Sequence, residues 1–272
     1  MEGMKLTDSY NQRANEWVDR IRSGKNFAHT YLEKPAMYRK LPNLRNKAVL
    51  CIGCGSAEEC MHLLDLGAKR VVGIDVSREL IAIARSSYPE AEFHVMDMRK
   101  LNFPGNSFDF VYSSLAMHYL KDWRPTLRGI RNVLKPNGRF LFSTHHPAYW
   151  SGEIIQSGNK KSRLLGYAKT GDRLKKVWGD YQHSRRINDV WFGNMEVSYY
   201  HHPLSKILKE IRDSGFEVVD LIEPKPLASL KKVAEDDYAL YNRIPLFMVF
   251  ELRKASRFAQ SNPRVPRVPD LR

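Results

Sequence analysis

The hydrophobic pattern from Lys47 onward alternates between short apolar runs and stretches with helical periodicity. This alternation is typical of successive β–α units around a parallel sheet. It predicts strands and helices in turn, with strands at 48–53, 70–75, 91–96, 108–114 and 138–145. After a helix at 203–215, two last strands are expected at 215–224 and 244–254. We therefore expect one α/β core.

The regular alternation stops after residue 145, and the pattern divides the chain into five parts. The segment 146–202, rich in Gly, Lys, Arg, Tyr and Trp, is expected to be an insertion, and loops this long are usually functional or disordered. It separates the core parts 47–145 and 203–254. Apolar residues at helical spacing predict a helical cap over 1–46. The proline-punctuated, basic segment 255–272 is expected to be a disordered tail.

Composition narrows the class of protein. A chain of 272 residues, 43% of them apolar, suits one α/β domain with an insertion. No run approaches the roughly 18 apolar residues of a membrane span, and the N-terminus lacks the apolar run of a secretory signal. Cys51, Cys54 and Cys60 lie too close together for a disulfide framework. We expect a cytoplasmic protein without membrane insertion.

Two features keep other functions open. Cys51 and Cys54 form a C-x-x-C pair, but a structural zinc site needs four ligands and no second pair exists, so we expect no metal. The net charge of +14 is concentrated in 158–186 and in the tail. Such clusters attract nucleic acid, anionic lipid or acidic substrates, although they are more often a solvated face. A nucleic-acid partner is possible but not favoured.

Small and acidic residues follow three neighbouring strands. Gly53 and Gly55 form a turn after the first strand, where a ligand can lie against the backbone. Asp75 ends the second strand, where a carboxylate can bind both hydroxyls of a ribose. Asp97 and Met98 follow the third strand and suit an adenine amino group and ring face. Each aspartate could instead cap the next helix, but together the three features predict a nucleoside pocket.

The turn also favours one kind of nucleoside cofactor. A dinucleotide needs its pyrophosphate against a G-x-G-x-x-G turn, and Glu58 stands where the third glycine would be. Its carboxylate would repel a phosphate. S-adenosylmethionine carries no phosphate and is therefore favoured over NAD or FAD.

The segments AVLCIGCGSAEE, GIDVS, VMDM, FDFVYSSLAMHYLKDW and VLKPNGRFLFS resemble the successive motifs of the class I methyltransferase family, especially its bacterial small-molecule and peptide-modifying branch. The resemblance implies a Rossmann-like seven-stranded mixed sheet of order 3-2-1-4-5-7-6, with the last strand antiparallel and an insertion after strand five. It also implies S-adenosylmethionine as cofactor and S-adenosylhomocysteine as product.

The same resemblance assigns the cofactor residues. They are Tyr10 near the amino acid end, Gly53, Cys54 and Gly55 at the methionine, Asp75 and Val76 at the ribose, Asp97 and Met98 at the adenine, and Ser113 and Ser114 beneath the sulfonium. Two positions depart from the family pattern. Cys51 stands where an acidic residue usually closes the first strand, and Ala57 stands where a third small glycine is usual. Losing the acid removes a charged partner for the methionine ammonium.

Methyl transfer from a sulfonium is an in-line displacement, so alignment of the reacting groups supplies most of the rate. A base is needed only for a protonated acceptor. The candidate bases are histidines, which titrate near neutrality: His118, His145, His146 and His201, the last beside His202. They could instead be hydrogen-bonded loop residues or metal ligands.

The insertion is expected to cover the acceptor side as a lid, with aromatic residues that either bind substrate or form a satellite core: Tyr149, Trp150, Trp191 and Tyr200. The sequence thus predicts an S-adenosylmethionine-dependent methyltransferase acting on a small molecule or a small exposed group. An RNA or protein methyltransferase using the basic insertion is an alternative. A catalytically weak cofactor-binding or interaction protein is another. Enzymes of this fold that methylate exocyclic amines of DNA are expected to carry Asn or Asp, then Pro-Pro and an aromatic residue, after strand four. Residues 113–116 read Ser-Ser-Leu-Ala instead, so this chemistry is disfavoured.

Overall fold

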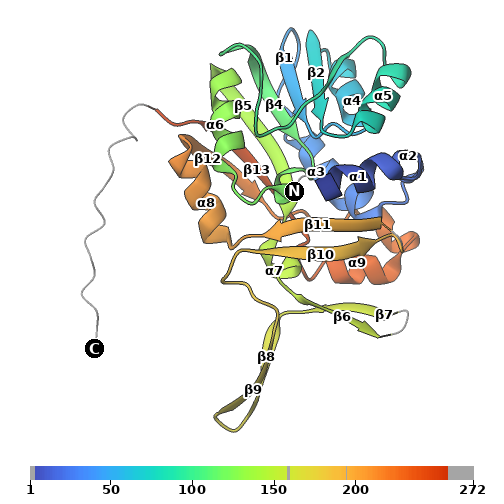
Figure 1. The fold of residues 1–272 in the computed structure, drawn as a ribbon, viewed down its shortest axis with the longest axis vertical. Helices are drawn as coiled ribbons and strands as arrows, with labels where there is room; N and C mark the ends of the chain where they lie inside the picture. The colour runs from blue at the N-terminus through green and yellow to red at the C-terminus, as the bar shows by residue number, and fades with distance from the viewer. Residues whose placement is uncertain (1–3, 158–159, 194, 257–272) are drawn as a thin grey trace.

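A seven-stranded mixed sheet forms the centre of the computed structural model, which describes residues 4–157, 160–193 and 195–256 (Figure 1). The strands lie side by side in the order β12-β13-β5-β4-β1-β2-β3. They are β1 (Ala48–Ile52), β2 (Arg70–Asp75), β3 (Glu92–Val95), β4 (Phe108–Ser113), β5 (Leu134–His145), β12 (Phe216–Ile222) and β13 (Phe247–Lys254). β13 is antiparallel to both its neighbours, and the pairings from β5 to β3 are parallel. The predicted order 3-2-1-4-5-7-6 is confirmed.

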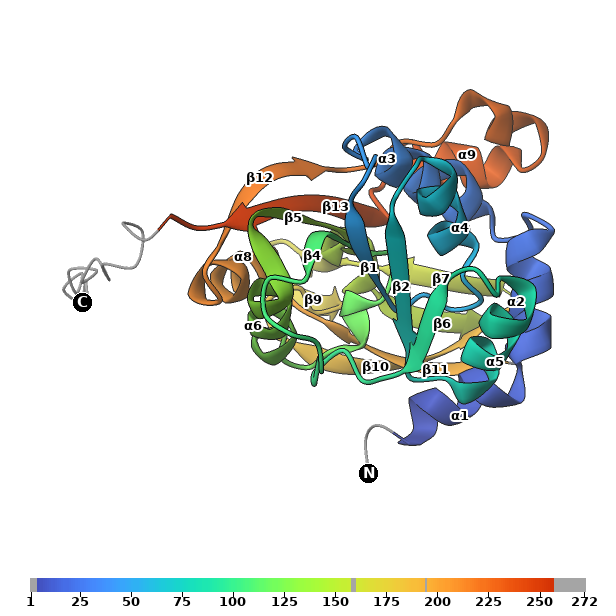
Figure 2. The same ribbon diagram turned by 90° about the horizontal axis from the view of Figure 1, so that it is seen from above.

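Helices cover both faces of the sheet because each carries one apolar side. On one face α6 (Arg124–Val133) and α8 (Leu204–Asp213) bury Ile130 and Ile207 against Phe140 of β5. On the other face lie α3 (Lys34–Arg39), α4 (Glu58–Asp65) and α5 (Arg78–Ser87). Burial of these apolar side chains, worth about 25 cal/mol per Å² of apolar surface, holds the layers together. Figure 2 shows this arrangement from above.

The N-terminal cap begins with two helices, α1 (Met4–Gln12) and α2 (Ala14–Arg22), separated by a break at Arg13. A π-helix, η1 (His29–Glu33), leads into α3. Such π segments are frequent at functional sites because they re-aim side chains. Here the π-helix carries a buried carboxylate, that of Glu33.

The strand expected at 138–145 begins earlier, at Leu134, directly after α6. Residues Pro136–Gly138 are therefore an irregular part of β5. A register shift opposite it, between Phe108 and Phe110, accommodates a proline that cannot donate to the ladder. A Cβ on Gly138 would lie 2.7 Å from Leu134 Cδ2, so the close approach requires glycine.

The insertion consists mainly of β-hairpins. A short helix, α7 (Pro147–Trp150), precedes three antiparallel pairs, β6 (Glu153–Ser157) with β7 (Lys160–Leu164), β8 (Gly166–Thr170) with β9 (Arg173–Trp178), and β10 (Arg185–Trp191) with β11 (Met195–His201). Figure 1 shows β10 and β11 against the body of the molecule and β8 and β9 projecting from it. Beyond the insertion, η3 (Ala228–Lys232) and α9 (Glu235–Tyr241) connect β12 to β13.

Three other expectations concern the whole chain. Cys51, Cys54 and Cys60 are buried, free thiols. Within the described ranges, no helix has the length and apolarity to cross a bilayer. The tail expected to be disordered lies almost entirely outside the described residues, which end at 256.

Candidate functional site

A cleft of about 2250 Å³ opens at the carboxyl ends of the parallel strands. Its lining includes the residues that follow β1, β2, β3 and β4, and on the opposite side residues of α1, α2 and the insertion hairpins. Open α/β sheets bind ligands at this edge. Pockets for one small ligand usually measure roughly 300–1,000 Å³, so this cleft has room for a nucleoside cofactor together with an acceptor.

The turn after β1 is shaped by three residues with left-handed backbone. Gly53 has φ +67°, and a Cβ there would lie 2.6 Å from Ala116 Cβ. Gly55 has φ +54°, and Ala57 has φ +78° just before α4. Left-handed backbone favours glycine, so Ala57 keeps the conformation that the usual glycine would take at a cost of about 1 kcal/mol. Gly53, Cys54 and Gly55 all line the cleft.

Asp75 fixes this turn while facing the cleft. Its Oδ2 accepts a hydrogen bond from the Gly55 N–H at 3.0 Å, and its Oδ1 accepts one from the Ser77 N–H at 2.9 Å. Burial raises the pKa of Asp75, although these amides partly offset the rise. Each carboxylate oxygen has a second lone pair. Asp75 therefore orders the turn as a capping residue would, and it can still accept hydrogen bonds from a ligand.

The next strand ends contribute Val76, Asp97 and Met98 to the same cleft. Arg99 donates to the Asp97 carboxylate through Nε, at 2.9 and 3.0 Å, and through Nη2 at 2.6 Å. Burial alone would raise the pKa of Asp97, but the Arg99 guanidinium outweighs it and lowers the pKa. Met98 packs against the core beneath. An ionised carboxylate thus stands beside an apolar side chain in the cleft wall.

The end of the cleft near the Gly53 turn holds a charged cluster that the sequence did not reveal. His29 Nε2 lies 3.3 Å from Glu33 Oε2 and 3.3 Å from Glu59 Oε1, and Lys34 Nζ lies 3.4 Å from the same Glu59 oxygen. Burial alone would raise the pKa of Glu59, but His29 and Lys34 outweigh it and lower the pKa to about 2. His29 and Glu59 line the cleft. Glu59 is thus an ionised carboxylate in the cleft wall, paired with His29 and Lys34.

The segment after β4 passes under the cleft, held by the same cluster. Glu33 Oε1 accepts from the hydroxyls of Ser114, at 2.9 Å, and Ser143, at 2.5 Å. Ser143 Oγ in turn accepts from the Leu115 N–H at 2.9 Å, and Leu115 has a left-handed φ of +47°. Ser114 lines the cleft. The Ser113 hydroxyl instead donates to the Ile52 carbonyl, so its side chain belongs to the sheet.

Tyr10 enters the cleft from α1. Its hydroxyl is hydrogen-bonded to that of Tyr119, with 2.5 Å between the oxygens, and its ring meets Trp17 edge-on at 5.3 Å. All three residues line the cleft. The N-terminal cap therefore forms part of the site wall.

Two of the four candidate histidines face the cleft. The rings of His118 and His145 stack at 3.6 Å with 6° between their planes, and His145 stacks on Trp150 at 3.7 Å. Burial without a charged partner lowers the pKa of His118 to about 3, and burial also lowers the pKa of His145. Both imidazoles are therefore neutral near pH 7.

The other two candidates lie outside the cleft and have partners of their own. His146 Nδ1 accepts from the Ala148 N–H at 3.1 Å, capping α7, and its Nε2 lies 2.8 Å from Glu223 Oε1. His201 Nε2 donates to the Tyr181 carbonyl at 2.9 Å. Neither of these two histidines lines the cleft.

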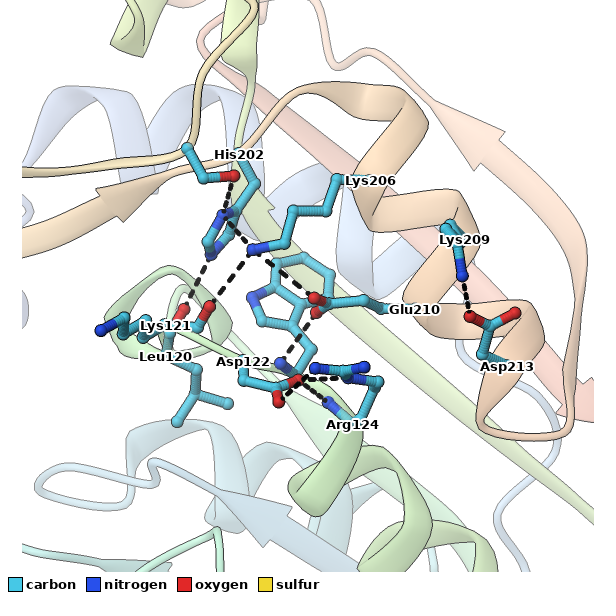
Figure 3. Close-up of polar contacts among 11 residues, drawn as sticks. Leu120, Lys121, Asp122, Arg124, His202, Lys206, Lys209, Glu210 and Asp213 are labelled. Atoms are coloured by element: carbon cyan, nitrogen blue, oxygen red, sulfur yellow. Dashed lines mark hydrogen bonds and ion pairs between the residues drawn. The ribbon is translucent and has the colours of Figure 1, made fainter.

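His202 belongs to a hydrogen-bond network that links α8 to the segment after η2 (Met117–Tyr119) (Figure 3). Its Nε2 lies 2.9 Å from the Leu120 carbonyl, which can only accept, so Nε2 carries the proton. Its Nδ1 then accepts from Lys206 Nζ at 3.1 Å. Glu210 Oε2 accepts from the Trp123 N–H at 2.9 Å. This network holds the wall that carries His118.

The four aromatic residues expected at the acceptor side all line the cleft. Trp150 and Trp191 lie 6.0 Å apart, and Tyr149 meets Trp150 edge-on at 5.2 Å. Tyr200 stacks on His202 at 6.1 Å. Several of these side chains also pack against buried ones, Trp150 and Trp191 against Tyr199 among them. The aromatic residues are therefore both cleft lining and part of a satellite core.

A buried ion pair, also missed from the sequence, ties the hairpins together at this end. Asp189 of β10 accepts hydrogen bonds from Lys161 and Arg163 of β7, and from the Trp191 Nε1–H at 3.2 Å. The Arg163 guanidinium also lies 4.7 Å from the ring centre of Trp150. No group of His, Cys, Asp and Glu within the described part of the chain has the arrangement of a metal site.

Comparison with known proteins gives three results. Residues 50–142 match the model of a methyltransferase domain family. A demethylmenaquinone methyltransferase from Chlorobaculum parvum is 30% identical over 174 residues, covering 64% of this chain and 67% of that one. An uncharacterised protein from Haemophilus influenzae is 26% identical over 249 residues, covering 86% and 92%.

A crystal structure of an S-adenosylmethionine-dependent methyltransferase from Mesorhizobium loti matches with a TM-score of 0.68 and 26% identity, covering 85% of this chain and 99% of that one. The fold and the cleft thus define a Rossmann-like enzyme with a nucleoside-sized site at its strand ends. The chain belongs to the class I S-adenosylmethionine-dependent methyltransferase family. Its cofactor is S-adenosylmethionine.

Proposed function

We propose that the chain transfers the cofactor's methyl group to a small molecule bound between the Gly53 turn and the insertion hairpins. The observation that carries this proposal is the cleft itself, which joins a carboxylate-rich end to an aromatic end walled by α7, β10 and β11. One relative, named a demethylmenaquinone methyltransferase, acts on a small molecule and supports the same class of acceptor here.

The residues at the carboxylate-rich end fit the cofactor. The bare backbone at Gly53 and Gly55 leaves room for the methionine part, and the Asp75 carboxylate suits the ribose hydroxyls. Asp97 and Met98 suit the adenine. Glu59, ionised beside His29, is a counter-charge for the ammonium group that Cys51 cannot supply.

When bound, the cofactor supplies an activated methyl group, so the chain's own residues must align the acceptor and exclude water. Trp150 and Trp191 are flat surfaces against which an acceptor can be held. His118 and His145 present unprotonated ring nitrogens to the cleft, but their lowered pKa values make them weak general bases, so the proposal rests on alignment of an acceptor that needs little help with proton removal. Neutral imidazoles also avoid repelling the cofactor's positive sulfur.

The three free, buried thiols agree with a reducing compartment, so we propose that the enzyme works in the cytoplasm. RNA or protein methylation is the alternative that the basic insertion keeps open. The interaction-protein alternative is disfavoured, because the ionised Glu59 offsets the loss of the acid at Cys51.

The test is transfer of a labelled methyl group into fractionated cell extract. We expect label in the small-molecule fraction, and we expect Trp150→Leu to reduce it while cofactor binding, measured by calorimetry, stays within twofold of wild type. The matched control is Trp178→Leu, a tryptophan outside the cleft. Label confined to RNA or to protein would contradict the proposed acceptor class.

A further inference from the structure

The hairpin of β8 and β9, residues 166–178, projects from the molecule without a layer packed on either face (Figure 1). We call it the basic hairpin. Nearly every residue of its two strands is exposed. A two-stranded hairpin alone is marginally stable in water, so a projecting hairpin with apolar side chains is stabilised when another surface covers it.

The register of the basic hairpin sorts its side chains into two faces. Tyr167 pairs with Val177, and Lys169 pairs with Leu174. Cross-strand partners share a face, and so do Tyr167 and Lys169, which are two apart in β8. These four side chains therefore lie together, across the bulge that separates Leu174 from Val177. Tyr167 is 67% exposed, and Leu174 and Val177 are each 55% exposed. One face is therefore apolar and edged by a lysine.

The opposite face and the tip are basic. Lys176 lies over the Trp178 ring at 5.4 Å, on the face opposite Val177. Arg173 lies next to the tip, and Lys175 stands at the bulge between the pairs. Asp172 is the one acidic residue between 166 and 178. The hairpin thus combines exposed apolar side chains with an excess of positive charge.

We propose that the basic hairpin docks the enzyme peripherally on an anionic lipid surface. Apolar side chains can enter the headgroup region while neighbouring lysines contact anionic headgroups. Lysine on an exposed strand edge also discourages strand pairing between copies, but that role leaves the apolar face unexplained. Nucleic acid would use the charges but has no need of three apolar side chains on one face. A second copy would bring like charges together.

The hairpin follows β7 directly along the chain, and β7 contributes Lys161 and Arg163 to the cleft lining. Docking would therefore place the acceptor side of the cleft near the bilayer. This inference is independent of the proposed function, because it concerns a surface outside the cleft.

The experiment is cosedimentation of the full-length protein with vesicles of phosphatidylcholine, alone or mixed in equal parts with phosphatidylglycerol. We expect binding to the mixed vesicles only, weakened by added salt. Lys175→Gln with Lys176→Gln should lower the partition coefficient about thirtyfold. The matched control is Lys231→Gln with Lys232→Gln on η3, which should bind as wild type does.

A second pair of variants tests the apolar face. Val177→Asp should weaken vesicle binding at least tenfold, whereas Val233→Asp, at a position equally exposed at 55%, should not. Both sites are on the surface, so the fold should persist, and thermal melts will verify this. Equal binding by wild type and the hairpin variants would overturn the proposal. So would absence of vesicle binding, and binding to single-stranded RNA that the same variants abolish would assign the hairpin to nucleic acid.

Discussion

The two ends of the cleft keep their titratable groups in different charge states. At the cofactor end, cationic partners hold Glu59 and Asp97 ionised, with the pKa of each lowered. At the acceptor end, His118 and His145 are buried without a counter-charge and are neutral near pH 7. Neutral imidazoles at the acceptor end would not repel the positive sulfur of the cofactor. From this difference we predict that cofactor binding and methyl transfer can be altered independently.

The strongest disruption of the cofactor end is Gly53→Val. Its φ of +67° disfavours a branched side chain, and its Cβ would lie 2.6 Å from Ala116 Cβ. We expect cofactor binding to weaken at least a thousandfold in calorimetry. The control is Gly105→Ala, whose added Cβ would meet its nearest neighbour at 3.5 Å. Wild-type affinity in Gly53→Val would show that the turn does not contact the cofactor.

The corresponding disruption of the acceptor end is Asp189→Asn. It leaves Arg163 without its buried counter-charge, and breaking a buried pair costs about 3 kcal/mol. We expect the hairpins to become protease-sensitive and methyl transfer to fall, while cofactor affinity stays within twofold of wild type. The exposed Asp172→Asn is the control. Equal loss of cofactor affinity would mean that the two ends are not independent.

Asp75→Asn should have a smaller effect on the cofactor end. The asparagine side chain has no negative charge. Its NH₂ group must also face the backbone N–H of Gly55 or of Ser77, and two donors cannot form a hydrogen bond with each other. A hydrogen bond to a charged group contributes about 1.5–3 kcal/mol, so we expect cofactor affinity to fall by about ten- to a hundredfold. Asp65→Asn, at the end of α4, is the control. An unchanged affinity would exclude Asp75 from the site.

The smallest predicted effect is a loss of stability at acid pH. The pH range of this loss differs between the two ends of the cleft. His118, with its pKa lowered to about 3, binds a proton when unfolded but not when folded between about pH 6.5 and 3. The free energy of unfolding should therefore fall as pH drops below 6.5, by about 1.4 kcal/mol per unit. Glu59 affects stability in a lower pH range, because the stability that its ionised carboxylate contributes is lost as pH falls from about 4.5 toward 2.

Urea unfolding at pH 7.5 and 5.5 measures the histidine part. His118→Phe should reduce the loss of stability between these pH values, and the exposed His183→Phe should leave it unchanged. An equal loss in wild type and His118→Phe would show that His118 is protonated in the folded protein.

The cofactor end was more predictable than the acceptor end for a physical reason. Regular β–α alternation fixes where strands end, so Gly53, Asp75 and Asp97 could be placed together from spacing alone. The backbone at Ser113 was placed there too, and its hydroxyl donates to the Ile52 carbonyl. The partners that set the charges, such as His29 and Glu59, come from distant segments. Local patterns do not reveal such contacts.

The hairpins within the insertion were not predicted, because their strands are short and mostly exposed. β10 and β11 do alternate between buried and exposed positions, and this signal could have been found. β8 and β9 show no burial pattern at all. Which histidines face the cleft depends on packing between β5 and the hairpins. His145 and His146 are neighbours, yet one stacks on Trp150 in the cleft and the other caps α7.

The most direct test of the central claim is a crystal structure of the protein with S-adenosylhomocysteine. We predict the ribose hydroxyls within hydrogen-bond distance of the Asp75 carboxylate and the amino acid part against Gly53 and Gly55. The sulfur should face His145 and Trp150. A ligand bound elsewhere, or one whose ribose points away from Asp75 into solvent, would contradict the account.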